Sequence, residues 1–175
     1  MILSVKPNPP ETRSGGVIEA DDVTRFQRAL SMLADSLSEL RSVAHHIIPI
    51  ALTRYGVKTA LSDLCHAIPS VEFHHSGDDR RLDSKLETLL YRAAHELINN
   101  ALKHAEATQI NVRLLQTSDH ISLTVQDNGK GFDPATTTKG TGLENIRHNA
   151  TAHNGKLLIH STIGKGTEIE LRVES

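Results

Sequence analysis

The chain has 175 residues, which is enough for one domain with a sizeable core and an additional segment. Hydrophobic residues make up 38% and aromatic residues only 3%, without any Trp, so Leu, Ile, Val and Ala must build the core. The net charge of −2 and the lack of a basic run argue against nucleic acid as a partner. The single cysteine, Cys65, excludes an internal disulfide and is typical of a reducing compartment. Because no apolar run approaches the roughly 18 residues of a bilayer span and no signal peptide is visible, we expect a cytoplasmic piece.

The N-terminal part of the chain contains two different patterns. Residues 1–21 are rich in Pro and Gly, which predicts an irregular segment. From residue 22 onward, apolar residues recur at spacings of three and four, which predicts a helix of about 25 residues that ends before Pro49. This stripe consists of Phe26, Leu30, Leu33, Leu37, Leu40, Ala44 and Ile47. So narrow a stripe favours either a partner helix or packing on the following domain, and the pattern alone does not choose between them.

Residues 57–175 alternate between helix and strand patterns. Helical spacing predicts helices over 59–68, 84–105 and 143–152, and alternation predicts strands over 71–75, 109–115, 121–127, 157–161 and 168–173. A loop with four glycines covers 128–142. Helices gathered on one face of a mixed, mostly antiparallel sheet are the natural layered solution for this order of elements. We therefore predict an α+β fold, a two-layer sandwich preceded by the long N-terminal helix.

The predicted helix over 84–105 has two distinct faces. Its start is indicated by Ser84 and Glu87, which have the spacing of a capping box. The face that should pack inward consists of Leu89, Leu90, Ala93, Ala94, Leu97 and Ala101. The second face carries Glu96, Asn100, Lys103 and His104. A carboxylate, a carboxamide oxygen and a cation on one face suit a magnesium ion and its phosphates, although most charged helix faces are merely solvated.

Two glycine motifs follow this helix. Asp127-Asn128-Gly129-Lys130-Gly131 lies where a strand leaves the sheet, so its carboxylate can accept a hydrogen bond from an exocyclic amine while its glycines permit a tight turn. Gly140-Thr141-Gly142-Leu143 precedes a helix, where exposed backbone N–H groups form a phosphate cradle. Neither is the common phosphate loop or the dinucleotide fingerprint. Each alone is more often a plain turn, but their order behind Glu96 and Asn100 favours a nucleotide site.

Together, these motifs resemble the ATP-binding domain that gyrase, histidine-kinase and mismatch-repair ATPases share, and they resemble the sensor histidine kinases closely. Glu96-x-x-x-Asn100-Ala101-x-Lys103-His104 is similar to the N box of this family. Asp127-x-Gly129-x-Gly131 and Gly140-x-Gly142-Leu143 resemble its two glycine boxes, and Gly164-x-Gly166-Thr167 resembles its closing glycine–threonine element. The resemblance covers residues 24–175.

A second resemblance concerns the region before the catalytic motifs. The run from Leu40 to Pro49, followed by Leu52 and Tyr55-Gly56, is similar to the second dimerisation helix and linker of kinases that pair with LuxR-type (NarL-like) response regulators. The implied layout is an irregular remnant over 1–21, the second dimerisation helix and linker over 22–56, and the ATP-binding catalytic domain over 57–175. The resemblance also implies that the intact protein is a homodimer.

The resemblance implies a role for each matching residue. Asn100 would coordinate Mg²⁺ between the phosphates of ATP, and Glu96 would orient a metal-bound water or assist the transfer. Lys103 and His104 would lie near the phosphates. At the other end, Asp127 would receive the adenine amino group with Thr167 nearby, and the backbone at Gly129 and Gly131 would pass close to the base. The phosphate side would be shaped by Gly140, Thr141, Gly142 and Leu143, next to a mobile lid over 133–139.

The sequence departs from the family in one respect. The resemblance implies a phosphate-accepting histidine, followed by an acidic residue, on a helix ahead of the second dimerisation helix. No such motif stands near the start of the chain. His45 and His46 match the linker side of the second helix rather than the acceptor. We therefore expect the chain to bind ATP without phosphorylating itself.

The function that the resemblance implies is that of a two-component sensor kinase fragment. It would move the γ-phosphate of ATP to a histidine, and from there to an aspartate of a response regulator. Two other enzyme classes stay open, an anti-sigma-type serine kinase and a gyrase-class nucleotide switch. A non-catalytic module for dimerisation or docking is a further alternative. Whether the full-length protein is anchored in a membrane also stays open.

Overall fold

The computed structural model describes residues 25, 28, 32, 49–134 and 141–174. The chain divides into two compact units, Met1–His46 and Ile47–Ser175. Of the first unit, only Arg25, Arg28 and Met32 are described, and each is helical. The predicted irregular segment over 1–21 and the apolar stripe from Phe26 to Ile47 lie outside the described residues. The second unit carries the sheet and all the motifs.

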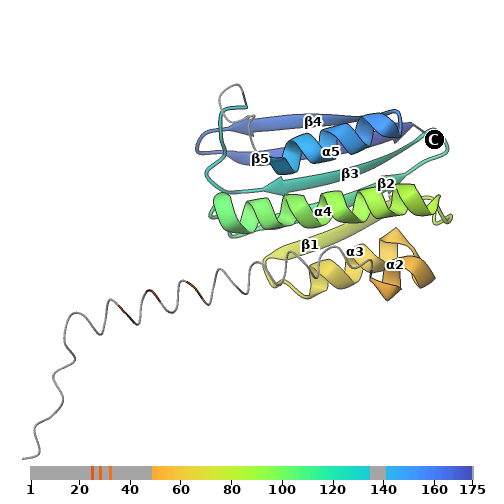
Figure 1. Ribbon diagram of the computed structural model, residues 1–175, viewed down its shortest axis with the longest axis horizontal. Helices are drawn as coiled ribbons and strands as arrows, with labels where there is room; N and C mark the ends of the chain where they lie inside the picture. Colours follow the sequence, from red (N-terminus) through yellow and green to blue (C-terminus); the bar gives the residue numbers. More distant parts are fainter. Residues whose placement is uncertain (1–24, 26–27, 29–31, 33–48, 135–140, 175) are drawn as a thin grey trace, which may run out of the picture. The chain divides into compact units, whose positions relative to one another are not determined.

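The second unit is built on one five-stranded sheet with the strand order β1-β2-β3-β5-β4 (Figure 1). The strands are β1 (Val71–Gly77), β2 (Ile110–Gln116), β3 (His120–Asp127), β4 (Gly155–Thr162) and β5 (Gly166–Glu174). Only the β1–β2 pair is parallel, and the other three pairs are antiparallel. The prediction of a mixed, mostly antiparallel sheet in an α+β fold is therefore confirmed.

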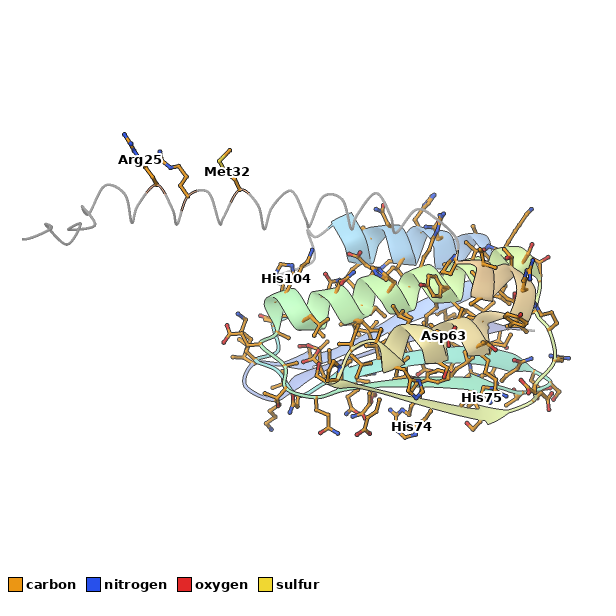
Figure 2. All side chains as sticks on the ribbon, turned by 90° about the horizontal axis from the view of Figure 1, so that it is seen from below. Arg25, Met32, Asp63, His74, His75 and His104 are labelled. Atoms are coloured by element: carbon orange, nitrogen blue, oxygen red, sulfur yellow. The ribbon has the colours of Figure 1, made fainter. Side chains whose placement is uncertain are left out.

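The described helices cover one face of this sheet, and none of them lies on the other, open face (Figure 2). The helices are α2 (Ile50–Tyr55), α3 (Val57–His66), α4 (Ser84–His104) and α5 (Thr141–Ala152). Apolar residues at alternate positions of the central strands point toward them and are buried, such as Val112, Leu123 and Leu171. Most of the intervening residues are polar, and on the edge strand β1 Figure 2 shows His74 on the side away from the helices. Because only one face of the sheet is covered by the core, a shift of one residue would move the apolar side chains to solvent. The alternation of apolar and polar residues thus sets the register of each strand.

The helix α4 runs across the middle of the sheet and supplies much of the core. The face predicted to pack inward is buried throughout: Leu89, Leu90, Ala93, Ala94, Leu97 and Ala101. Because α4 connects the parallel strands β1 and β2, it is the crossover helix that parallel pairing requires. Its C-terminal half therefore lies over the sheet, where one helix face can border a cavity.

The start of α4 differs from the prediction. The N-cap is Asp83, whose Oδ1 accepts a hydrogen bond from the Lys85 N–H at 2.9 Å, so Ser84 is the first helical residue and not the cap. Glu87 is 2% exposed and does not complete a capping box. Instead, its carboxylate forms an ion pair with Arg81, with 2.9 Å between Nε and Oε1. An ion pair with a residue just before the helix thus replaces the predicted capping contact.

A short helix, α2, occupies the segment that the sequence indicated as a linker. Its residue Leu52 is buried in the core of the second unit. Arg81 Nη2 donates to the carbonyl oxygens of Leu52 and Thr53, both at 2.9 Å, which satisfies acceptors at the end of the helix. Gly56, with φ 87°, then makes the sharp turn into α3. Among the described helices, none combines the length and apolar character that a bilayer crossing demands.

Candidate functional site

A cavity of about 510 Å³ lies between the C-terminal half of α4, the ends of β3 and β5, the loop after β3 and the first turn of α5. This volume is in the range that small organic ligands occupy. The predicted site residues that line it are Glu96, Asn100, Lys103, His104, Asp127, Gly131, Gly142, Leu143 and Thr167. Gly140 lies outside the described residues. Sequence positions up to 71 residues apart, from Glu96 to Thr167, therefore meet in one place.

The polar end of the cavity is formed by α4. Glu96 and Asn100 are half-buried and one helical turn apart, and Asn100 Nδ2 donates a long hydrogen bond of 3.5 Å to Glu96 Oε1. With its amide nitrogen engaged in this way, the Asn100 carboxamide oxygen remains an acceptor for another group. Lys103 and His104 follow on the exposed end of the helix, and Figure 2 shows His104 there. This end of the cavity therefore carries two side chains with acceptor oxygens, Glu96 and Asn100, beside basic side chains.

The opposite end is formed where β3 and β5 pair. Asp127 is the last residue of β3 and lies directly across from Thr167 in the antiparallel register. Asp127 Oδ1 accepts a hydrogen bond from the Gly129 N–H at 2.8 Å, which fixes the carboxylate at the start of the loop. A carboxylate has about four lone-pair positions, so capacity for a ligand remains. Val125 and Ile169 precede and follow this pair and give the cavity an apolar wall.

The loop after β3 is held on both sides by backbone hydrogen bonds. The Lys130 N–H donates to the Ala105 carbonyl at 2.8 Å, and the Lys130 carbonyl accepts from the Gly164 N–H at 2.7 Å. A Cβ at position 129 would overlap the Ala105 carbonyl oxygen, so only glycine lets the loop lie against the end of α4. The requirement for Gly129 thus arises from contact between two chain segments, whereas the sequence indicated approach to a ligand.

The first turn of α5 meets α4 across the cavity. A Cβ at position 142 would overlap Glu96 Oε1, so Gly142 leaves the space that this carboxylate occupies. Gly142 and Leu143 both line the cavity. The first N–H groups of a helix have no acceptor within the helix, which makes this wall suitable for an anion. The helix begins at Thr141, two residues before the predicted start.

The cavity residues that the sequence interpretation did not assign to the site include Lys130 and Phe132. Lys130 Nζ forms an exposed ion pair with Glu106 at 3.0 Å. Phe132 supplies the one phenyl ring of the described cavity wall. Both lie inside or just after the first glycine motif, so their position in the sequence was the available signal. In contrast, Gly129, which was predicted to contact the ligand, is not among the residues that line the cavity in the described part of the chain. The side chain of Thr141, also predicted to contact the ligand, lies outside what the structure describes.

Comparison with known proteins agrees with this geometry. The family of histidine kinase-, DNA gyrase B- and HSP90-like ATPases matches residues 85–175, which contain every motif of the cavity. The chain belongs to this family. Membership of this ATPase family implies that the domain binds ATP.

Individual relatives point to sensor proteins. The chain is 32% identical over 146 residues to the sensor protein VraS of Staphylococcus aureus, in strains COL and MRSA252. The match includes 81% of this chain and 42% of each relative, so the chain spans about two fifths of the length of these curated relatives.

Solved structures show the same fold. The histidine kinase domain of a blue-light activated histidine kinase from Erythrobacter litoralis superposes with a TM-score of 0.54 at 18% identity, over 67% of this chain and 60% of that one. The corresponding longer structure of that kinase gives a TM-score of 0.52 at 18% identity, over 65% of this chain and 39% of that one. At this level of identity, the likeness concerns the fold of the ATPase domain alone.

Proposed function

We propose that this chain is the ATP-binding catalytic fragment of a two-component sensor histidine kinase. The observation that carries the proposal is the single cavity with Glu96 and Asn100 at one end and Asp127 opposite Thr167 at the other. In the intact protein, the γ-phosphate of ATP would move to a histidine and then to an aspartate of a LuxR/NarL-type response regulator. The intact kinase would work as a homodimer, with residues 22–56 as the second dimerisation helix and linker, and its catalytic part would act in the cytoplasm.

The side chains at the α4 end fit a magnesium ion that accompanies ATP. In phosphate sites, Mg²⁺ is usually held by one or two protein oxygens together with phosphates and water. Here the Asn100 carboxamide oxygen would be the protein ligand, and the Glu96 carboxylate lies within hydrogen-bond reach of the same side chain. When bound, the ion would neutralise charge on the transferred phosphoryl group. Among the described residues, no three His, Cys, Asp or Glu side chains gather into a metal site.

The remaining roles belong to the chain's own groups. Glu96 would orient water at the polar end or assist the transfer, while Lys103 and His104 would attract the phosphates. Asp127 would accept a hydrogen bond from the adenine amino group, with Thr167 beside it. The first turn of α5, through Gly142 and Leu143, would lie along the phosphates. Phosphoryl transfer depends mainly on placement and on charge stabilisation, which these groups can provide together.

Calorimetric titration of the chain with ATP, with and without Mg²⁺, tests the metal assignment. We expect magnesium-dependent binding that Asn100→Ala abolishes. Asn99→Ala is the matched control, because Asn99 is the neighbouring asparagine on α4 but bonds to the His95 ring, outside the cavity wall. Equal affinity of the unmutated chain and Asn100→Ala would refute the metal role. Loss of affinity in both variants would indicate damage to α4.

The adenine end is tested separately. Asp127→Asn should weaken ATP by about tenfold or more, because a hydrogen bond to a charged group contributes about 1.5–3 kcal/mol. Its effect on inorganic triphosphate should be much smaller. Equal binding of ATP and GTP by the unmutated chain would contradict the role of Asp127. A chain that binds no nucleotide would favour the docking module instead, and transfer of phosphate to a protein serine would favour the anti-sigma class.

A further inference from the structure

The two ends of the cavity are carried by different segments of the chain. Glu96 and Asn100 are on α4, and Asp127 is the last residue of β3. After α4, the chain runs through residues 105–109 before β2 begins at Ile110, which pairs with Asp127. The connection over 105–109 thus joins the two ends of the cavity directly.

One side chain, Asn128, attaches this connection to the loop after β3. Its Oδ1 accepts hydrogen bonds from the Thr108 and Gln109 N–H groups, both at 3.0 Å, and its Nδ2 donates to Thr108 Oγ1 at 2.9 Å. Because backbone N–H groups can only donate, the carboxamide oxygen must be the atom that faces them. The side chain thus extends the contact between the two segments beyond Ile110 and Asp127, the last residue pair of β2 and β3.

Two backbone hydrogen bonds accompany this side chain. The Asn128 N–H donates to the Gln109 carbonyl at 3.3 Å, and the Lys130 N–H donates to the Ala105 carbonyl at 2.8 Å. Between these points, Glu106 has a φ of 54°, a conformation that costs a residue other than glycine free energy. A connection with this conformation needs partners that hold it in place, and the Asn128 side chain supplies three hydrogen bonds.

Asn128 acts on a ligand only indirectly. It is exposed and is not among the described residues that line the cavity, although its neighbour Asp127 is. A ligand that contacts only Asp127, or only the side chains of α4, does not depend on the spacing between the two ends. A ligand that spans both ends binds well only where that spacing is already correct, because otherwise binding must order the connection at a cost in free energy.

We infer that Asn128 is a positioning residue that holds the connection over 105–109 and thereby sets the spacing between the phosphate end and the base end of the nucleotide site. This inference rests on the proposed function, since it takes ATP as the ligand that spans the two ends. It adds a residue that lies outside the cavity wall but determines how well both ends can be bound at once.

A comparison of ATP with ligands that occupy only one end isolates this effect. We expect Asn128→Ala to weaken magnesium-dependent ATP binding by about three- to tenfold, as the net loss of one hydrogen bond would, while adenosine and magnesium triphosphate lose less than about twofold. Gln126→Ala is the matched control, since Gln126 is exposed two positions earlier on β3 and is not among the described cavity residues. It should leave all three affinities unchanged. Calorimetry measures ATP binding, and chemical-shift titration measures the two weaker ligands.

A second set of variants separates positioning from folding. Asn128→Asp keeps an oxygen for both N–H groups, whereas Asn128→Leu has a similar size without a polar atom. At high salt, which screens the added exposed charge, we expect Asn128→Asp to keep the ATP affinity and Asn128→Leu to lose it. Thr108→Val removes only the acceptor of Asn128 Nδ2, so its loss should be smaller. Combined with Asn128→Ala, it should cause no further loss, because both changes remove the same interaction.

Amide hydrogen exchange reports on the contact itself. The Thr108 and Gln109 amides should exchange faster in Asn128→Ala, and ATP should restore part of their protection. The inference is wrong if Asn128→Ala leaves the ATP affinity unchanged. Equal weakening of ATP, adenosine and triphosphate would show a structural role alone and would also overturn it, as would an Asn128→Asp variant that behaves like Asn128→Leu.

The same titrations distinguish this inference from the proposed function. An unmutated chain that does not bind ATP refutes both. An unmutated chain whose ATP affinity falls in Asn100→Ala but not in Asn128→Ala refutes the role of Asn128 alone.

Discussion

Two glutamates on the same helix, Glu87 and Glu96, have opposite surroundings. Glu87 lies in the first half of α4 and is 2% exposed. Its carboxylate is surrounded by donors from the protein, because Arg81 Nε lies 2.9 Å from Oε1 and 3.0 Å from Oε2, and the Leu82 N–H lies 3.4 Å from Oε1. Glu96 lies in the second half, half-buried, with a long bond to the neutral Asn100 amide. The partners, rather than the residue type, decide which carboxylate is structural and which is available to a ligand.

The closed half of α4 extends its interactions to the start of the domain. Arg81 pairs with Glu87 and also donates to two carbonyl oxygens of α2. One guanidinium, with five N–H donors in a rigid fork, therefore joins α2, the loop before α4 and α4 itself. The open half borders the cavity instead, and there Glu96 accepts a 3.5 Å hydrogen bond from Asn100. The N-terminal half of α4 is thus fixed by contacts within the protein, whereas its C-terminal half can contact a ligand.

The largest effect should come from removing the Arg81 side chain. Arg81→Met leaves the Glu87 carboxylate buried without its charged partner, and it also removes the donors to Leu52 and Thr53. We expect a loss of about 3 kcal/mol in the free energy of unfolding, in the range for removing the partner of a buried charge, because Glu87 is buried while the Arg81 side chain is 46% exposed. Denaturant titration measures this loss.

The matched control for Arg81→Met is Lys58→Met. It breaks the Lys58–Asp79 ion pair, whose side chains are 44% and 70% exposed and whose atoms are 2.7 Å apart. An exposed pair contributes only about 0–1 kcal/mol. If both variants lost the same stability, burial of Glu87 would not explain the difference between the two halves of α4.

A smaller effect is expected when each of the two glutamates is replaced by glutamine, and the two replacements should differ in what they change. Glu87→Gln weakens hydrogen bonds that involve two charged groups, so we expect a loss of about 2 kcal/mol in stability. Glu96→Gln should change stability by less than about 0.5 kcal/mol. Phosphoryl transfer to a supplied acceptor domain should instead fall by about 100-fold or more if Glu96 assists the transfer. Loss of transfer in Glu87→Gln alone, at a temperature where it is folded, would reverse these roles.

The smallest effect concerns the alkaline pH dependence of stability through Cys65, on α3. Burial raises the pKa of the Cys65 thiol to about 11, above the ordinary value of about 8.5. Below pH 8.5, both the folded and unfolded states keep the proton, so stability is unaffected. Between these values only the unfolded state ionises, and we expect a loss of about 1 kcal/mol at about pH 9. Chemical denaturation at about pH 7 and about pH 9 measures it.

The control for the thiol is Cys65→Ala, which should lower stability at both pH values but reduce the difference between them. A residual difference is expected because burial also raises the pKa of Tyr91, with further contributions from Asp63 and Cys65. An unchanged pH difference in Cys65→Ala would show that the thiol does not contribute.

Local patterns were sufficient for most elements of the fold. The inward face of α4, the strand alternation and the hairpin across Gly164 could be predicted because each depends on residues that are near one another in sequence. The cap of α4 could not be predicted correctly. Ser84 and Glu87 had suitable spacing, but Asp83 stood one position earlier, and Arg81 took the Glu87 carboxylate through a contact that includes α2.

The site was predictable in its polar residues and less so in its packing. Glu96, Asn100, Asp127 and Thr167 belong to recognisable spacings, and their assigned roles remain predictions. The contact of Asn128 with Thr108 and Gln109 depends on the register of β2 against β3 and on the path of the chain after α4. No local pattern encodes such a contact. The same holds for Gly129, whose packing partner is a carbonyl at the end of α4.

The open face of the sheet can accept amino-acid substitutions without loss of the core. Side chains such as Glu72, Arg113 and Arg172 lie there in solvent, on strands whose opposite side carries the core. Their replacement changes β-propensity and surface charge but leaves the packing under the cavity intact. Lineages can therefore diversify this surface, and an experimenter can attach a fluorophore or a surface tether to it, at little risk to nucleotide chemistry on the other side.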